Sequence, residues 1–106
     1  MVETIVAAAT AWVLWIGTLG RGGPWDWDPN QSFDSRAECY AQKQKEIDSW
    51  EREANLSQKE IDEGLRSKND MVMVSGDEVY LVGETRIMYR YHCLPVPIDP
   101  REQKQR

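Results

Sequence analysis

The chain has few of the residues that catalysis and metal binding need. Its 106 residues include one histidine, two cysteines and no Cys-x-x-Cys pair, so a structural zinc site and a redox dithiol both lack ligands. No Gly-x-Ser-x-Gly or comparable setting for a nucleophile is present. Asp26 and Asp28 resemble the opening of a calcium loop, but Gln31 stands where that loop needs glycine. We therefore expect no enzymatic activity, no bound metal and no cofactor.

Basic residues are outnumbered, with 13 Lys and Arg against 18 Asp and Glu, which gives a net charge of −5. An acidic chain has no long-range attraction for nucleic acid or anionic lipid, so neither is the expected partner. The length suits one domain with a single core. We expect that domain over residues 10–100, after a signal remnant or disordered segment over 1–9 and before a disordered tail over 101–106.

Long hydrophobic runs are missing as well. The most apolar segment, residues 5–19, is shorter than the roughly 20 residues that cross a bilayer. Ala7-Ala-Ala9 has the small-x-small form of an export cleavage site, and Trp12-Val-Leu-Trp-Ile16 is rich in strand-forming residues. We predict a strand over about 10–18 after the remnant of an export signal. The alternatives are a short membrane span over 2–19, which would tether an accessory subunit, and a short helix.

The rest of the chain reads as one long helix and several strands. Ser35 and Glu38 form a capping box that begins the helix, and Gly64 is a plausible end if the helix continues through residues 55–57. The apolar stripe of this helix is Tyr40, Ile47, Trp50, Ala54, Ile61 and Leu65. The other expected strands are 25–28, 71–74, 79–82 and 86–93. The sequence thus predicts an α+β fold: an antiparallel sheet, made of an N-terminal hairpin and a C-terminal meander, with one long helix packed on one face.

The two cysteines lie where such a fold could join them. In Arg86–Cys93 the side chains alternate, so that Tyr91 and Cys93 face the core while Arg90 and His92 face away. Cys39 lies in the first turn of the helix, which must be fixed over one edge of the sheet. A bridge between Cys39 and Cys93 would contribute about 4 kcal/mol in the chain-entropy account. We predict this disulfide; the alternative is two separate small core residues.

Four short motifs lie at the two ends of the chain and at the start of the helix. They are Trp12-Val-Leu-Trp15, Phe33-Asp-Ser-Arg-Ala-Glu-Cys39, Tyr91-His-Cys-Leu-Pro95 and Asp99-Pro-Arg101. In these motifs the chain resembles a family of small exported bacterial proteins that carry a Trp-Val-Leu-Trp strand, a Glu-Cys helix start and a Tyr-x-Cys-Leu-Pro ending followed by Asp-Pro-Arg. The resemblance implies export to the periplasm or the cell exterior, and the disulfide; it implies no activity.

Aromatic and basic residues supply the candidate binding surface. Five tryptophans in so short a chain are unusual, and Trp25 and Trp27 would share one face of a strand. They form either an exposed aromatic pair for a protein, peptide or small molecule, or a cap on the core. Arg86, Arg90 and His92 form a basic row that either binds an anion or is neutralised by neighbouring acids. The function that follows is a small exported non-catalytic binding or structural module.

Overall fold

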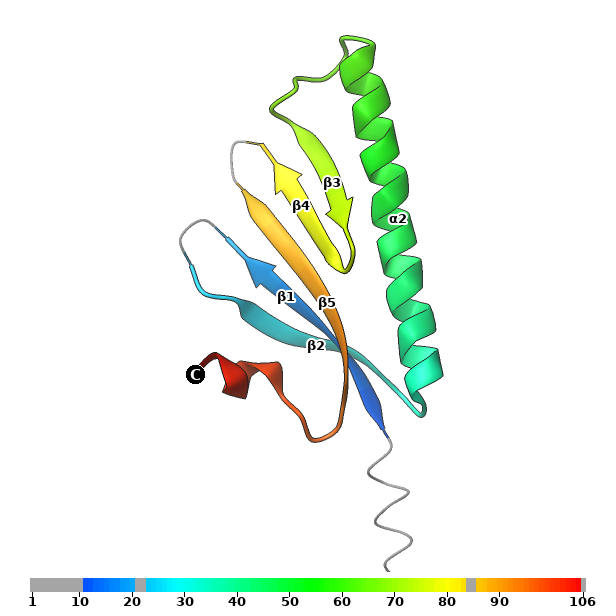
Figure 1. Cartoon of the computed structure of the whole chain (residues 1–106), viewed down its shortest axis with the longest axis vertical. Coiled ribbons are helices and arrows are strands. Elements are labelled where there is room, and N and C mark those ends of the chain that lie inside the picture. The colour runs from blue at the N-terminus through cyan, green and yellow to red at the C-terminus, as the bar shows by residue number, and fades with distance from the viewer. Residues whose placement is uncertain (1–10, 21–22, 84–85, 106) are drawn as a thin grey trace, which may run out of the picture.

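The computed structural model describes residues 11–20, 23–83 and 86–105, so the expected signal remnant over 1–9 lies outside the described residues. One helix lies against a five-stranded antiparallel sheet of order β2-β1-β5-β4-β3 (Figure 1). The elements are β1 (Trp12–Leu19), β2 (Asp26–Phe33), α2 (Arg36–Asp62), β3 (Met71–Ser75), β4 (Glu78–Val82), β5 (Ile87–Pro95) and the 3₁₀ helix η1 (Pro100–Gln105). The α+β fold class expected from the sequence is confirmed.

Helix α2 begins and ends at local signals that the sequence carries. The Ser35 side chain accepts a hydrogen bond from the Glu38 N–H at 3.2 Å, which satisfies one free donor of the first turn. At the other end Gly64 adopts a φ of +78°, and the Leu65 N–H donates to the Glu60 carbonyl at 2.8 Å. This arrangement satisfies the last carbonyls of the helix and turns the chain.

Helix α2 continues without a break through residues 55–57. Ser57 does not cap a second helix; it is buried, donates to the Ala54 carbonyl and accepts from the Val72 N–H at 3.3 Å. The serine therefore links the C-terminal third of α2 to β3, the strand that α2 contacts more than any other. Two members of the expected stripe are solvent-exposed, Tyr40 at 39% and Leu65 at 75%.

The core lies between α2 and the sheet. Its buried residues are Leu14, Cys39, Ile47, Val79, Tyr91 and Cys93. A disulfide joins Cys39 to Cys93, with their Cα atoms 6.0 Å apart, and so fixes the start of α2 to the end of β5. Farther along the helix, the indole N–H of Trp50 donates to the Tyr91 hydroxyl at 2.9 Å.

Two segments differ from the expectation. Strand β2 continues through Pro29 to Phe33, because an edge strand tolerates a residue without N–H and the pairing shifts register between Leu14 and Trp15.

The tail expected to be disordered from residue 101 starts as η1. Arg101 accounts for this order: it forms a two-pronged ion pair with Asp99 and lies 5.0 Å from the ring centroid of Trp15.

Residues 12–19 form a strand between β2 and β5 rather than the second half of a membrane span. Aromatic and branched side chains on both faces of this strand are buried or partly buried, which explains why the segment is so apolar. Among the described residues, no helix has the length and hydrophobicity needed to cross a bilayer.

Candidate functional site

The candidate residues lie on the sheet face that points away from α2, which we call the open face. Side chains alternate along a strand, so Trp15 and Trp27 belong to this face although they are only 6% and 7% exposed. Of the described elements, η1 reaches one corner of it, where Pro100 is buried and Arg101 lies over Trp15. A sheet face without a covering layer is commonly polar. This one instead buries two tryptophans.

Trp27 packs tightly on the strand beside it. It pairs in register with Gly17 of β1, and a Cβ at Gly17 would lie 2.8 Å from the Trp27 Cζ3 atom. The Trp25 ring stacks on Trp27 with centroids 5.8 Å apart and planes inclined by 27°. Trp27 is therefore held in place by its packing on β1. Trp25 is less buried, and it is the indole that a ligand could contact.

Arg90 is held between an aromatic ring and a carboxylate. Its guanidinium carbon lies 4.2 Å from the Trp25 ring centroid, and its Nε donates to Glu78 Oε2 at 2.7 Å. Hydrogen bonds from Tyr80 and then from Arg90 lower the pKa of Glu78. Arg90 and Glu78 are thus both charged at neutral pH, and their opposite charges nearly cancel. An acid on the neighbouring strand therefore offsets this part of the basic row.

His92 completes the cluster. It lies edge-on to Trp27 with ring centroids 5.0 Å apart. Burial, followed by the charge of Arg90, lowers the pKa of His92, so the imidazole is neutral at pH 7. A neutral imidazole offers one donor and one acceptor.

These side chains surround a hollow of about 480 Å³, which we call the aromatic hollow. Its lining is Pro24, Trp25, Trp27, Arg90, His92, Leu94 and Pro100. The walls are mostly apolar, and the polar groups are a paired guanidinium and a neutral imidazole. Such a lining can hold a flat apolar group and hydrogen-bond a neutral polar atom beside it.

Arg86 is not part of the aromatic hollow. It lies at the other end of β5, exposed, at the rim of a second hollow of about 590 Å³. Leu19, Tyr80 and Met88 from three adjacent strands line this second hollow. The structure therefore divides the expected basic row, with Arg90 and His92 in one place and Arg86 in another.

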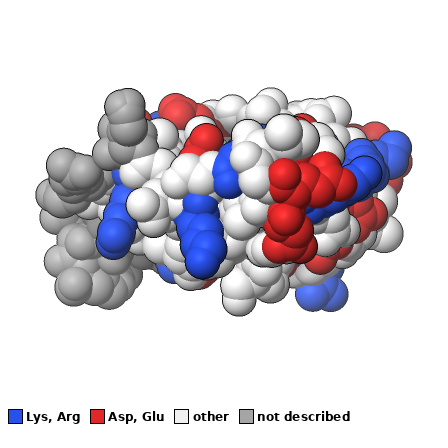
Figure 2. Space-filling model, turned by 90° about the horizontal axis from the view of Figure 1, so that it is seen from above, with Lys and Arg blue, Asp and Glu red and all other residues white. Residues whose placement is uncertain are grey.

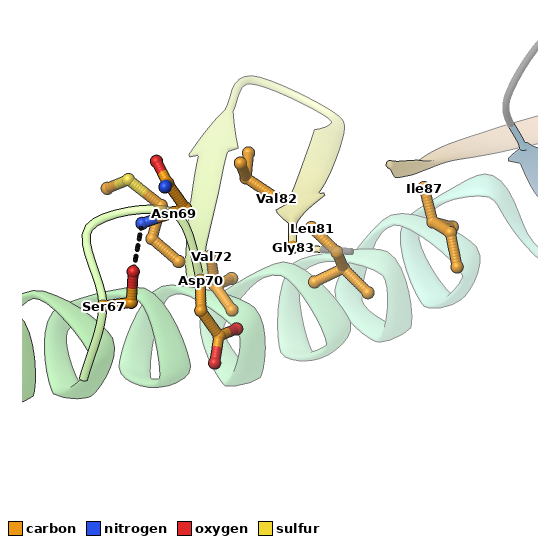
Figure 3. Close-up of a pocket in the computed structure, with 9 residues that line it drawn as sticks. Ser67, Asn69, Asp70, Val72, Leu81, Val82, Gly83 and Ile87 are labelled. Carbon is orange, nitrogen blue, oxygen red and sulfur yellow. Dashed lines mark hydrogen bonds between the residues drawn. The ribbon is translucent and has the colours of Figure 1, made fainter. Parts of the chain in front are cut away.

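A third hollow, of about 670 Å³, lies on the helix side at the ends of β3 and β4 (Figure 3). Leu81 and Ile87 point toward α2 and form its apolar floor, while Ser67 and Asp70 form a polar rim. Among the described residues of the lining, Asp70 is the one titratable side chain, and it pairs with Arg66 at 3.7 Å. A single paired carboxylate gives this hollow no acid–base couple.

Sequence reasoning missed part of the open face. The register aligns Leu19, Met88, Tyr80 and Met73 across β1, β5, β4 and β3; we call this set the methionine row. Met71-Val-Met-Val74 is apolar at every position, so its alternation gave no sign of which residues face outward.

Within the described part of the chain, no three His, Cys, Asp or Glu side chains are close enough to hold a metal ion. Comparison with protein-family models, with curated proteins and with solved structures yields no significant match. The chemistry of the hollows is therefore the basis for inferring function.

Proposed function

We propose that the protein is a small exported binding module without catalytic activity, and that the aromatic hollow receives an aromatic side chain of a peptide or protein partner. One observation carries the proposal: Trp25, Trp27, Arg90 and His92 converge on a hollow of the open face, outside the core that α2 and the sheet enclose. Core packing alone does not account for this cluster.

The chemistry of the lining favours a neutral aromatic group over an anion. Glu78 already engages Arg90, and His92 is neutral, so the hollow has little net charge to attract an anionic ligand. The Trp25 ring offers a stacking surface, and an offset aromatic pair contributes about 0.5–1.5 kcal/mol beyond area burial. The remaining donors of Arg90 and the imidazole could bond a neighbouring peptide carbonyl.

Export is supported by the buried disulfide. Cys39 and Cys93 are 0% and 7% exposed, and a bridge of this kind persists in oxidising compartments such as the periplasm or the cell exterior. The resemblance to exported bacterial proteins points the same way and remains a prediction.

The binding proposal can be tested with N-acetyl-phenylalanine amide, a neutral peptide-like probe, titrated into the disulfide-intact full chain with ¹⁵N-labelled tryptophan. We expect the indole signals of Trp25 and Trp27 to shift together at millimolar concentrations. The signal of Trp50, whose N–H is bonded to Tyr91 on the helix side, should stay in place. N-acetyl-alanine amide and methyl glucoside serve as probes that lack an aromatic ring.

A matched pair of variants locates the binding. Trp25→Ala should abolish the shift of Trp27, whereas Tyr40→Ala, which removes an exposed aromatic ring from α2, should leave it unchanged. Equal shifts of every indole, or shifts as large with methyl glucoside, would contradict an aromatic-specific hollow.

A further inference from the structure

The methionine row is a second apolar area of the open face, separate from the aromatic hollow, and no element among the described residues covers it. Met73 is 43% exposed, and Leu19, Tyr80 and Met88 are partly exposed. Methionine side chains adapt their shape and are frequent on surfaces that bind other proteins. A contiguous apolar strip across four strands indicates a contact surface in a chain that is otherwise 29% charged.

Few charged side chains lie next to this row. Arg90 and Glu78 face each other across β5 and β4, and they are the charged residues of the described strands on the open face. Arg86, just before β5, adds one exposed cation at the rim of the hollow that Leu19, Tyr80 and Met88 line. The chain as a whole has a net charge of −5, and the helix side carries acidic side chains interspersed with Lys and Arg when the molecule is seen from the end where α2 finishes (Figure 2). Two copies would repel least through the open face.

We propose that two copies of this chain associate through their open faces, about a two-fold axis that runs parallel to the strands between β4 and β5. Such a two-fold axis lies in the plane of contact. It places β5 of one copy opposite β4 of the other, and β1 opposite β3. The register then places Leu19 opposite Met73 of the second copy, and Met88 opposite Tyr80.

The same axis makes the adjacent charges complementary. Arg90 of one copy lies opposite Glu78 of the other, and the reverse holds on the second side of the axis. Sheet-on-sheet packing of this kind is a common way to cover the second face of an antiparallel sheet. The hollow lined by Leu19, Tyr80 and Met88 would be filled by side chains of the second copy.

The overlap predicts a weak dimer. Four strands at about 4.8 Å spacing and five residues at about 3.4 Å span roughly 19 Å by 17 Å, or about 320 Å² in plan on each copy. The two copies together would cover about 640 Å² in plan, well below the roughly 1,200 Å² of a stable specific interface, so we expect the association to be weak or transient. Strand β2 lies outside the overlap, but Arg90 and His92 of β5 also line the aromatic hollow, so the hollow adjoins the proposed interface.

Sedimentation of the disulfide-intact chain from 5 µM to 1 mM tests the proposal. We expect the weight-average mass to rise with concentration from 12.3 kDa toward twice that value. Met73→Glu should weaken association at least tenfold, because it places a carboxylate against Leu19 of the second copy. Leu56→Glu is the matched control, since Leu56 is exposed to a similar degree, 47%, on α2.

A direct contact test does not depend on the variants. Within one copy β5 and β4 separate Leu19 from Met73 by roughly 14 Å, too far for a nuclear Overhauser effect between their methyl groups. Such an effect in a mixed-isotope sample would place the two residues across the dimer. A chain that stays monomeric to 1 mM, or a Leu56→Glu variant weakened as much as Met73→Glu, would overturn the proposal; so would a monomer that binds phosphatidylcholine vesicles through this face.

Discussion

Gly17→Ala is the sharpest test of how the open face is packed. Gly17 is buried on β1 under the Trp27 ring, and an added Cβ would lie 2.8 Å, 2.9 Å and 3.0 Å from three atoms of that ring. Carbon atoms do not approach so closely, so the ring or the strand must move. The φ of Gly17 is not in the left-handed region, so alanine itself strains no backbone angle there.

The expected cost follows from these contacts. Overpacking a tight site destabilises a protein by about 1–3 kcal/mol, because neighbours leave their preferred positions. Replacing a glycine without strain would by itself stabilise the chain by about 0.4–1 kcal/mol, so a net loss isolates the clash. A loss of about 1 kcal/mol lowers the melting temperature of a domain of this size by about 4–8 °C.

Urea unfolding followed by far-ultraviolet circular dichroism gives the free energy of each variant. Gly20→Ala is the control, because a Cβ there meets no atom of the described residues within 4 Å, and it should change stability by less than about 0.5 kcal/mol. In a Trp27→Leu background the Gly17→Ala cost should vanish, since leucine lacks the clashing ring atoms. A cost that persists unchanged in that background would refute the proposed packing.

Three further predictions concern the core and the titration of His92. Replacing Cys39 and Cys93 by serine opens a link across a sequence separation of 54 residues and should cost about 4 kcal/mol in urea unfolding; a loss under about 1 kcal/mol would contradict a stabilising bridge. Tyr91→Phe leaves the Trp50 N–H without its acceptor and should cost about 1–2 kcal/mol, with a shifted Trp50 indole proton in the NMR spectrum. Because burial lowers the pKa of His92 below its ordinary 6.5, the unfolded chain takes up this proton first. Stability should therefore be level above about pH 7 and fall as the pH drops through 6.5 toward the lowered value, and this slope should be absent from urea midpoints of His92→Gln.

The parts of the fold that could be predicted depend on local chemistry. Ser35 caps the helix because a side-chain oxygen three residues before a free N–H is sufficient. The alternation at the end of β5 placed Tyr91 and Cys93 in the core, and Cys93 within reach of Cys39. These features need only the neighbouring residues and the period of the strand.

The parts that could not be predicted depend on how α2 crosses the sheet. Its hydrophobic stripe places Leu65 in the core, yet this leucine lies past the end of the helix and is exposed, while Ser57 is buried. Burial of Ser57 costs little free energy because its hydroxyl donates to the Ala54 carbonyl and accepts from the Val72 N–H. A hydropathy pattern cannot anticipate a partner on a strand fifteen residues away.

The same reasoning explains why only part of the open face could be predicted: alternation placed Arg90 and His92 away from the core but did not reveal the methionine row. The sequence allowed Trp25 and Trp27 to be either a cap on the core or an exposed pair, because alternation along a short strand does not say which face a helix will cover. Only the register, which sets Trp27 over Gly17 and aligns Met88 with Tyr80, separates the open face from the core face. Within the described part of the chain α2 covers one face of the sheet, and the apolar side chains of the open face are those that the proposed second copy would cover.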